Sequence, residues 1–433
     1  MSTEVIGLIG IIVLISLFMF KIPVSISLIL VGLLGTILIR GFDVAFAQLG
    51  RTPFDTASSY SLSVIPLFIL MGMILSYTGI GGDLYLAVDR WMGHLRGGLA
   101  MATIGTASIF SAISGSLNAT TATVAKITLP EMKKYNYSDG LSTACVAAGG
   151  TLGVLIPPSV VLILYGILTR EPIGKLLISG ILPGILQMLL FMLTVYILVR
   201  RNPKLAPARA EKASLSERFL SLKNIIPFLI LFLISIGGIY MGIFTPTEAA
   251  GVGAIGALLI GFVTRRLDWA KLKTSFDETV RITVNIFLIV IGATLFGQFL
   301  TVSRIPVQLT SYIGSLDLSP YIIFALILLA LIILGCFIDG LSIIVLTLPI
   351  LYPIIKALGF DGLWFGVIMV IATNIGALTP PLGISVYVIK GVAKIIPLQT
   401  IFKGVMPMIY TMIVCIIILL IFPQIVTFLP SFM

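Results

Sequence analysis

The sequence predicts an all-α polytopic membrane protein built from two inverted repeats, with two re-entrant helical hairpins and two broken helices. Of its 433 residues, 58% are hydrophobic and only 10% are charged, and its apolar runs approach bilayer length. A Gly-x3-Pro-Pro motif occurs at Gly153 and again at Gly376. Other landmarks of the first half also recur about 220 residues later. A period of this length is expected for the half-repeats of a transporter.

Each Gly-x3-Pro-Pro motif interrupts an apolar helix in the same way. Proline has no N–H group, so a double proline leaves the carbonyls four residues earlier, at Gly153 and Val154 in the first copy, without their helical donors. The residues before the prolines, Ile156 and Thr379, are pushed towards an extended backbone. Within a bilayer, freed carbonyls need another partner. Two matched breaks therefore indicate a binding site that is built twice.

The charge distribution also indicates a membrane protein. The net charge is +10, but the Lys and Arg residues lie in loops between apolar runs, which suits lipid headgroups and membrane topology rather than nucleic acid. The apolar run Val5 to Phe20 lacks the basic flank of a signal peptide and is interpreted as the first retained span. The three cysteines lie singly in apolar segments and are interpreted as packing residues.

The first repeat is predicted to cover residues 1–200. It begins with three spans, and a surface arm helix around Trp91 follows them. A hairpin is expected next, because residues 113–121 are rich in small hydroxyl and amide side chains in the middle of an apolar region. In chain order, the predicted elements are spans at 4–20, 23–40 and 61–79, the arm at 83–95, the hairpin at 100–135, the broken helix at 138–168 and a last span at 181–199.

A cytoplasmic basic linker is predicted at 201–223, since this stretch is rich in Lys and Arg and contains Pro203 and Pro207. The second repeat then covers 224–433. Landmarks that pair between the halves include Pro23 with Pro246, Gly72 with Gly292, and the segment around Trp91 with that around Trp269. After its spans, the second repeat is predicted to contain an arm helix at 268–283, a hairpin at 321–356 and a broken helix at 360–395.

The number of crossings determines how the halves are related. Three spans, a hairpin that returns to its own side and two further spans give an odd total, so the second half is inverted. Placing the N-terminus in the periplasm puts most basic residues, including Lys21 and the linker, on the cytoplasmic side.

Asp339 is the sharpest single signal, because it lies between two apolar runs at the predicted turn of the second hairpin. A carboxylate at membrane depth is costly unless it is paired or solvated. The alternative is that Asp339 only caps a helix in a loop that reaches water. The functional interpretation is a cation ligand or a residue that controls access to one.

Each half offers hairpin-turn oxygens opposite the carbonyls of a broken helix. Oxygen ligands without thiolate or imidazole suit an alkali cation, and Na+ is the usual coupling ion. The alternative for any single Ser or Thr is interhelical packing. The candidate Na+ ligands are Ser114, Ser116, Asn118, Gly153, Ile156 and Pro158 in the first half, and Asp339, Gly376, Thr379 and Pro381 in the second. Because only the second half has a carboxylate, its site is expected to bind Na+ with more electrostatic help.

Half-helix N-termini at mid-membrane also suit an anionic substrate, because their N–H groups are unpaired. Arg304 could add charge-assisted binding of a carboxylate, although an Arg at the end of an apolar run is more often an interfacial anchor. The candidate substrate ligands are Asn118, Thr120, Ser342, Asn374 and Arg304.

Several of these motifs together resemble the large membrane subunit of tripartite ATP-independent periplasmic (TRAP) transporters over essentially the full length. They are Ile113-Ser114-Gly115-Ser116 with Ala119-Thr120, both Gly-x3-Pro-Pro breaks, and Phe244-Thr-Pro-Thr-Glu-Ala-Ala250. The resemblance implies an inverted-repeat elevator-type transporter in the bacterial inner membrane. It would import an organic anion, such as a C4-dicarboxylate or an acidic sugar like sialic acid, with two or more Na+ sites. Its implied partners are a small four-helix membrane subunit and a periplasmic substrate-binding protein.

Two other functions fit the composition less well. An intramembrane enzyme would use Ser114 or Ser116 as nucleophile, or Asp339 in an aspartyl dyad, but the only histidine, His94, is predicted on the surface helix. A passive anion channel would not need two matched closed hairpins.

Overall fold

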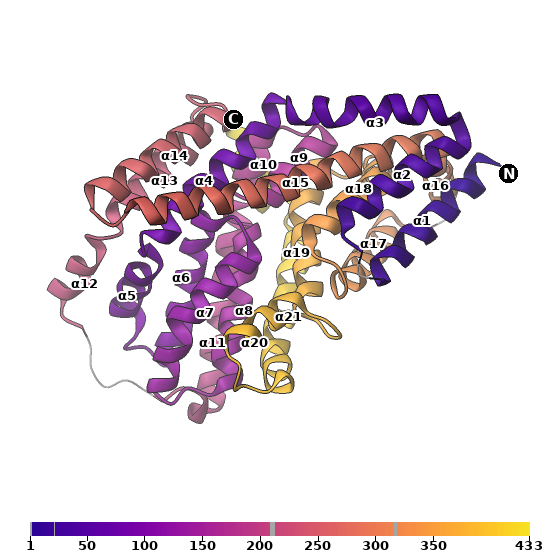
Figure 1. Cartoon of the computed structure of the whole chain (residues 1–433). Coiled ribbons are helices and arrows are strands. Elements are labelled where there is room, and N and C mark those ends of the chain that lie inside the picture. Colours follow the sequence, from indigo (N-terminus) through magenta and orange to yellow (C-terminus); the bar gives the residue numbers. More distant parts are fainter. Residues whose placement is uncertain (1, 21, 208–212, 316–317) are drawn as a thin grey trace.

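The computed structural model describes residues 2–20, 22–207, 213–315 and 318–433, which form α and 3-10 helices without a strand. Figure 1 shows the helices packed into one body, with α3 and α15 side by side along its upper edge. The first half of the chain comprises α1 (Thr3–Met19), α2 (Val24–Arg40), α3 (Phe42–Ala57), η1 (Tyr60–Ser63), α4 (Val64–Tyr77), α5 (Ile80–Met92), α6 (Gly98–Ser114), α7 (Leu117–Lys134), α8 (Asp139–Thr151), η2 (Leu152–Val154), α9 (Val160–Thr169), α10 (Ile173–Ser179) and α11 (Ile181–Arg201).

Two short elements, η3 (Pro203–Leu205) and α12 (Leu215–Leu222), connect the halves. The second half comprises α13 (Ile226–Tyr240), α14 (Pro246–Val263), α15 (Trp269–Ser303), α16 (Ile305–Gly314), α17 (Pro320–Gly335), α18 (Gly340–Ala357), α19 (Gly362–Leu378), α20 (Ile384–Val392), α21 (Leu398–Ile421), α22 (Gln424–Thr427) and η4 (Leu429–Phe432).

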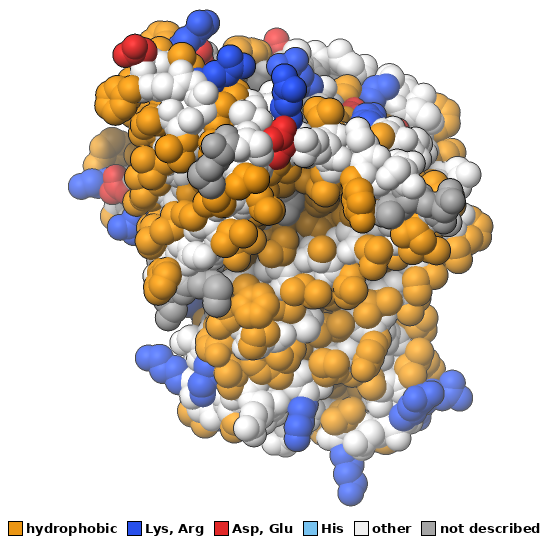
Figure 2. Space-filling view, turned by 90° about the vertical axis from the view of Figure 1, so that its right-hand side faces the viewer, with side chains coloured by type: hydrophobic (Ala, Val, Ile, Leu, Met, Phe, Trp, Pro, Cys, Tyr) orange, Lys and Arg blue, Asp and Glu red, His pale blue; other side chains and the backbone are white. Residues whose placement is uncertain are grey.

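The surface confirms the prediction of a multi-pass membrane protein. Within the described residues, six helices are long and apolar enough to cross a bilayer, or seven if the bent pair α12 and α13 forms one span. Figure 2 shows a broad hydrophobic band with Lys and Arg side chains gathered at the two ends of the molecule. Such a band suits contact with lipid tails, and the charged ends suit headgroups and water.

The two halves exchange equivalent contacts. In the outer part of the fold, α2 packs along α15, and α14 packs along α4. In the inner part, α7 packs on α20, and α18 packs on α9. Each half therefore completes the packing of the other, as two copies of one unit would do. The orientation of each half relative to the bilayer stays a prediction.

Two helical pairs and two interrupted helices occupy the inner part. The pair α6 and α7 turns at Gly115 and Ser116, and the pair α17 and α18 turns between Cys336 and Asp339. The first interrupted helix consists of α8, η2 and α9, and the second of α19 and α20. Their bounds fall close to the segments expected from the sequence.

The stretch between the second and third predicted spans forms a helix, α3, and the predicted linker contains the helix α12. Two expectations about secondary elements were wrong. The arm expected at 268–283 continues into the next apolar run as the single helix α15. The segments around Trp91 and Trp269 are not counterparts either, because α5 directly precedes its hairpin whereas α16 holds that place in the second half. Both Trp segments are amphipathic, and this property alone could not show that they occupy different places in the two repeats.

Some predicted positions lie outside the described residues. These are Lys21, at the end of the first predicted span, and residues 208–212 of the predicted linker.

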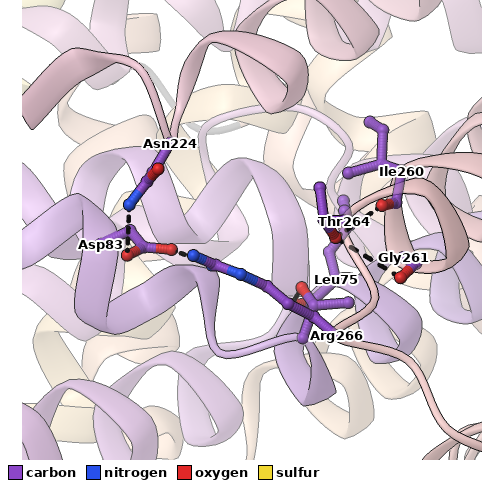
Figure 3. Close-up of polar contacts among 8 residues, drawn as sticks. Leu75, Asp83, Asn224, Ile260, Gly261, Thr264 and Arg266 are labelled. Carbon is purple, nitrogen blue, oxygen red and sulfur yellow. Dashed lines mark hydrogen bonds and ion pairs between the residues drawn. The ribbon is translucent and has the colours of Figure 1, made fainter. Parts of the chain in front are cut away.

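An ion pair joins the halves at one edge of the fold (Figure 3). Asp83 of α5 pairs with Arg266, which lies between α14 and α15, and Asn224 donates a hydrogen bond of 3.2 Å to the same carboxylate. The Asp83 side chain is only 14% exposed, so water screens this pair less than an open surface pair. Because Asp83 lies in the first turn of α5, the ion pair fixes the start of this helix against the second half.

Replacing Asp83 by Asn should lower the unfolding free energy by about 1–2 kcal/mol, since it leaves Arg266 without its counter-charge in a partly buried place. The midpoint of thermal unfolding in detergent measures this loss. Arg51→Gln is the control, because Arg51 and its partner Asp55 are 82% and 54% exposed. Its effect should stay below about 0.5 kcal/mol. Equal shifts in the two variants would contradict a stabilising role for the Asp83 pair.

Candidate functional site

A cavity of about 200 Å3 lies where the two hairpin turns approach each other. Its lining comes from both hairpins, from α19 and from the outer helices α4 and α15. The structure thus brings together five of the predicted residues, from positions far apart in the sequence. These are Ser114, Ser116, Asn118, Asp339 and Asn374.

The first hairpin turn presses against the first helix break. A Cβ atom added at Gly115, which has a φ of +56°, would lie 2.6 Å from the carbonyl oxygen of Pro158. A Cβ atom added at Gly153 would lie 2.8 Å from Thr120 Oγ1 and 3.0 Å from the Ser116 carbonyl oxygen. Backbone and hydroxyl oxygens of the turn and the break therefore face one another at close range.

Hydroxyl groups brace this turn internally. The Ser114 and Thr120 hydroxyl oxygens are 2.5 Å apart and share a hydrogen bond, and the Ser116 N–H donates to Ser114 Oγ at 3.4 Å. Thr120 is fully buried and does not line the cavity. Its place indicates support of the turn rather than direct contact with a ligand.

At the second turn, Asp339 caps α18 and also lines the cavity. Its carboxylate accepts hydrogen bonds from the Ser342 N–H at 3.1 Å and from the Ser342 hydroxyl at 2.5 Å. Each carboxylate oxygen has a second lone pair that these bonds do not use. Asp339 thus caps α18, and this capping leaves acceptor capacity for a cation. Ser342 itself is buried behind Asp339 and does not line the cavity.

Some of the backbone carbonyls that were expected to be free at the helix breaks accept hydrogen bonds. The Ser159 hydroxyl donates to the Val154 carbonyl at 2.6 Å, and the Thr379 N–H donates to the Gly376 carbonyl at 2.9 Å. The chain turns at each break, so residues just beyond it reach back. Gly376 also lies against Gly335 of α17, where its missing side chain permits close helix packing.

The remaining predicted residues lie away from the cavity lining. The Ile156 side chain packs against Gly184 of α11, and Pro381 is exposed. Arg304 joins α15 to α16 with a φ of +61°, beside the N-terminal helix α1. The structure does not bring Arg304 to the hairpin turns, so we leave it out of the proposed substrate site.

Sequence reasoning missed two polar residues of the cavity, Thr373 of α19 and Ser76 of α4. Thr373 lies beside Gly340, and its neighbour Asn374 donates a hydrogen bond of 3.2 Å to the Thr151 carbonyl at the end of α8. The adjacent polar residues Thr373 and Asn374 in an otherwise apolar helix could have indicated that Thr373 belongs to the site. Nothing in the sequence marks Ser76, which reaches the cavity only because α4 packs against the first hairpin.

The two hairpins offer the cavity opposite electrostatics. Ser116, the N-cap of α7, makes no side-chain cap, so the first N–H groups of α7 lack a capping acceptor. At α18 the equivalent end is capped by the Asp339 carboxylate. Among the described residues that line the cavity, none is Lys or Arg. An anion is therefore favoured at the α7 end by the helix dipole, and a cation is favoured at Asp339.

This fold and cavity define a multi-pass helical transport protein. The family model described as "Tripartite ATP-independent periplasmic transporter, DctM component" matches residues 11–425. The chain therefore belongs to the large membrane components of TRAP transporters, which are permeases rather than enzymes.

Two relatives and one solved structure illustrate the similarity. The chain is 36% identical to the C4-dicarboxylate large permease DctM of Pseudomonas aeruginosa, over 87% of this chain and 86% of that protein. It is 33% identical to the sialic acid large permease SiaM of Vibrio cholerae, over 94% and 95% of the two chains. The fold resembles the MtrF efflux pump of Neisseria gonorrhoeae, with a TM-score of 0.64 at 13% identity over 88% of this chain and 84% of that one.

Gly115→Ala should destabilise the protein by about 1–3 kcal/mol beyond its backbone strain, because the new methyl group would crowd the Pro158 carbonyl. Gly359→Ala is the control, since Gly359 also has a positive φ, +81°, but has open space around it. Thermal unfolding of the two purified variants measures the difference. Indistinguishable midpoints would contradict the close approach of turn and break.

Proposed function

We propose that this chain is the membrane core of a Na+-coupled secondary importer for an organic anion. The observation that carries the proposal is one cavity with an uncapped helix N-terminus on one side and Asp339 on the other. These groups suit simultaneous binding of an anion and a cation. Binding the two together lowers the net charge that must be moved through the bilayer, which is the electrostatic basis of symport.

The proposed cation ligands are oxygen atoms, as Na+ requires. In the first half they are the Ser114 hydroxyl and the carbonyls of Ser116, Gly153 and Pro158. In the second half they are the Asp339 carboxylate and the Thr379 backbone, next to the side chain of Thr373. A Na+ ion held at Asp339 would offset its charge and allow an anionic substrate nearby.

Asn118 and Asn374 are the proposed substrate ligands. Asn118 is exposed in the first turn of α7, near the uncapped N–H groups, and Asn374 lies across the cavity on α19. The relatives named above carry C4-dicarboxylates and sialic acid, so a carboxylate is the proposed common feature of the substrate.

The proposed mechanism is an elevator movement. The hairpins and broken helices would move as one unit against the outer helices α2, α4, α14 and α15, of which α4 and α15 line the cavity on one side. The implied partners are a small four-helix membrane subunit and a periplasmic binding protein. The proposed location is the bacterial inner membrane, with a periplasmic N-terminus. A passive channel is the competing function.

Asp339→Asn should reduce Na+-driven uptake by about a hundredfold, because it removes a charge worth a few kcal/mol at close range. The assay is uptake of labelled C4-dicarboxylate or sialic acid by proteoliposomes that contain this chain, its small membrane partner and its binding protein.

Asp361→Asn is a matched control. Asp361 caps α19 by accepting from the Trp364 N–H at 2.8 Å, as Asp339 caps α18, but it does not line the cavity. Its uptake should stay within about twofold of wild type, because Asn is also a good N-cap. Equal activity of both variants would reject the Na+ site. Uptake that persists without a Na+ gradient would favour the channel.

A further inference from the structure

A second cavity, of about 500 Å3, lies at the far end of the first hairpin. It forms where the last turns of α7 meet the first turn of α8 and the segment after α20. Three exposed lysines line it, namely Lys126 and Lys133 of α7 and Lys394 after α20, together with the exposed Asp139. The rest of its lining is mainly apolar, from Ala125, Leu129, Pro130, Val392, Ala393, Ile395 and Ile396.

The three lysines carry uncompensated charge. Within the described part of the chain, none of them forms an ion pair. Three ammonium groups against one carboxylate leave a net charge of +2 around the cavity. Like charges that share a cavity repel one another, so this arrangement favours an anionic ligand.

Hydrogen bonds hold the walls in place. Lys390 donates to the carbonyls of Lys394 and Ile396 at 2.7 and 2.8 Å, which folds the segment that carries Lys394 over the cavity. On the opposite wall, Ser138 caps α8 through the Leu141 N–H at 3.3 Å. The positive end of the α8 dipole therefore faces the same space, since Asp139 and Ser142 of its first turns line it.

The equivalent place in the second half contains an ion pair between an acidic residue and a lysine. There the end of α18 meets the start of α19 and the end of α9. Glu171, which follows α9, accepts a hydrogen bond from the Tyr352 hydroxyl at 2.5 Å and pairs with Lys356 at 3.2 Å. In the second half an acidic residue neutralises the lysine, whereas in the first half Lys394 adds a further positive charge. The two halves thus differ in charge at this place, so the basic lining of the first-half cavity is not a consequence of the repeat.

We propose that this cavity is a second binding site, for the carboxylate group of a small organic anion, with the apolar lining in contact with its carbon skeleton. The Ser138 N–H donates to the Leu205 carbonyl at 2.9 Å, so the cavity lies at the same end of the molecule as the basic linker. That end is the cytoplasmic one under the positive-inside rule. The site would receive the anion released from the central cavity. This role rests on the proposed function, whereas binding itself does not.

The test measures equilibrium binding of radiolabelled succinate to the full chain in nanodiscs of zwitterionic lipid, in potassium buffer without Na+. The protein carries Asp339→Asn, so that the Na+ site of the central cavity is disabled. Lys126→Gln combined with Lys394→Gln should weaken binding by about tenfold, because two favourable charge interactions are lost. Binding to the unmodified cavity should also weaken as the KCl concentration rises.

Lys134→Gln combined with Lys403→Gln is the charge-matched control, because both lysines are exposed and neither lines the cavity. Its succinate affinity should equal that of the parent. Equal weakening in both double variants would overturn the site, and so would failure of the parent to bind succinate at all. If phosphatidylglycerol, but not succinate, protects Lys126 and Lys394 from an amine-labelling reagent, the cavity holds lipid and the proposal is wrong. If the wild-type complex shows no Na+-driven uptake while succinate still binds to this cavity, that result would count against the proposed function alone.

Discussion

The structure depends on one constraint, that every backbone polar group at membrane depth needs a partner. The double prolines at Pro157 and Pro380 break two helices and would expose carbonyl groups to lipid. The fold meets this constraint by placing a hairpin turn or a reaching side chain against each break. The candidate binding region lies there, because the turns and breaks that satisfy each other also concentrate oxygen atoms and N–H groups around one cavity.

The exchange of contacts between the halves explains why this region is shared. Since α7 packs on α20 and α18 packs on α9, a helix of the other half completes the inner part of each half. The central cavity accordingly takes Ser116 from one half and Asp339 from the other. The hydrogen bond from Asn374 to the Thr151 carbonyl links the two interrupted helices in the same way.

The duplication has not kept the halves identical, and the differences coincide with the chemistry. One hairpin turn presents uncapped N–H groups, and the other presents a carboxylate. Pro157 and Pro158 are buried, whereas Pro380 and Pro381 are exposed. At the far ends of the hairpins, Glu171 neutralises Lys356, but Lys126 and Lys394 have no such partner among the described residues. Equal halves would offer equal sites, whereas the symport that we propose would need different sites for the anion and the cation.

The sequence by itself determined the membrane class and the positions of both hairpins and breaks, and it singled out Ser114, Ser116 and Asp339, which line one cavity. These features are local, because apolar run length, proline chemistry and an isolated carboxylate each act within a few residues. Only the tertiary structure decided which candidates meet. It turned Thr120 and Ser342 into supports, left Arg304 beside α1, supplied a donor to the Val154 carbonyl and brought in Ser76 and Thr373. The position of each of these side chains depends on how helices that are distant in the sequence pack together. The periodicity of a helix predicts which face is apolar, but it does not predict which other helix that face contacts.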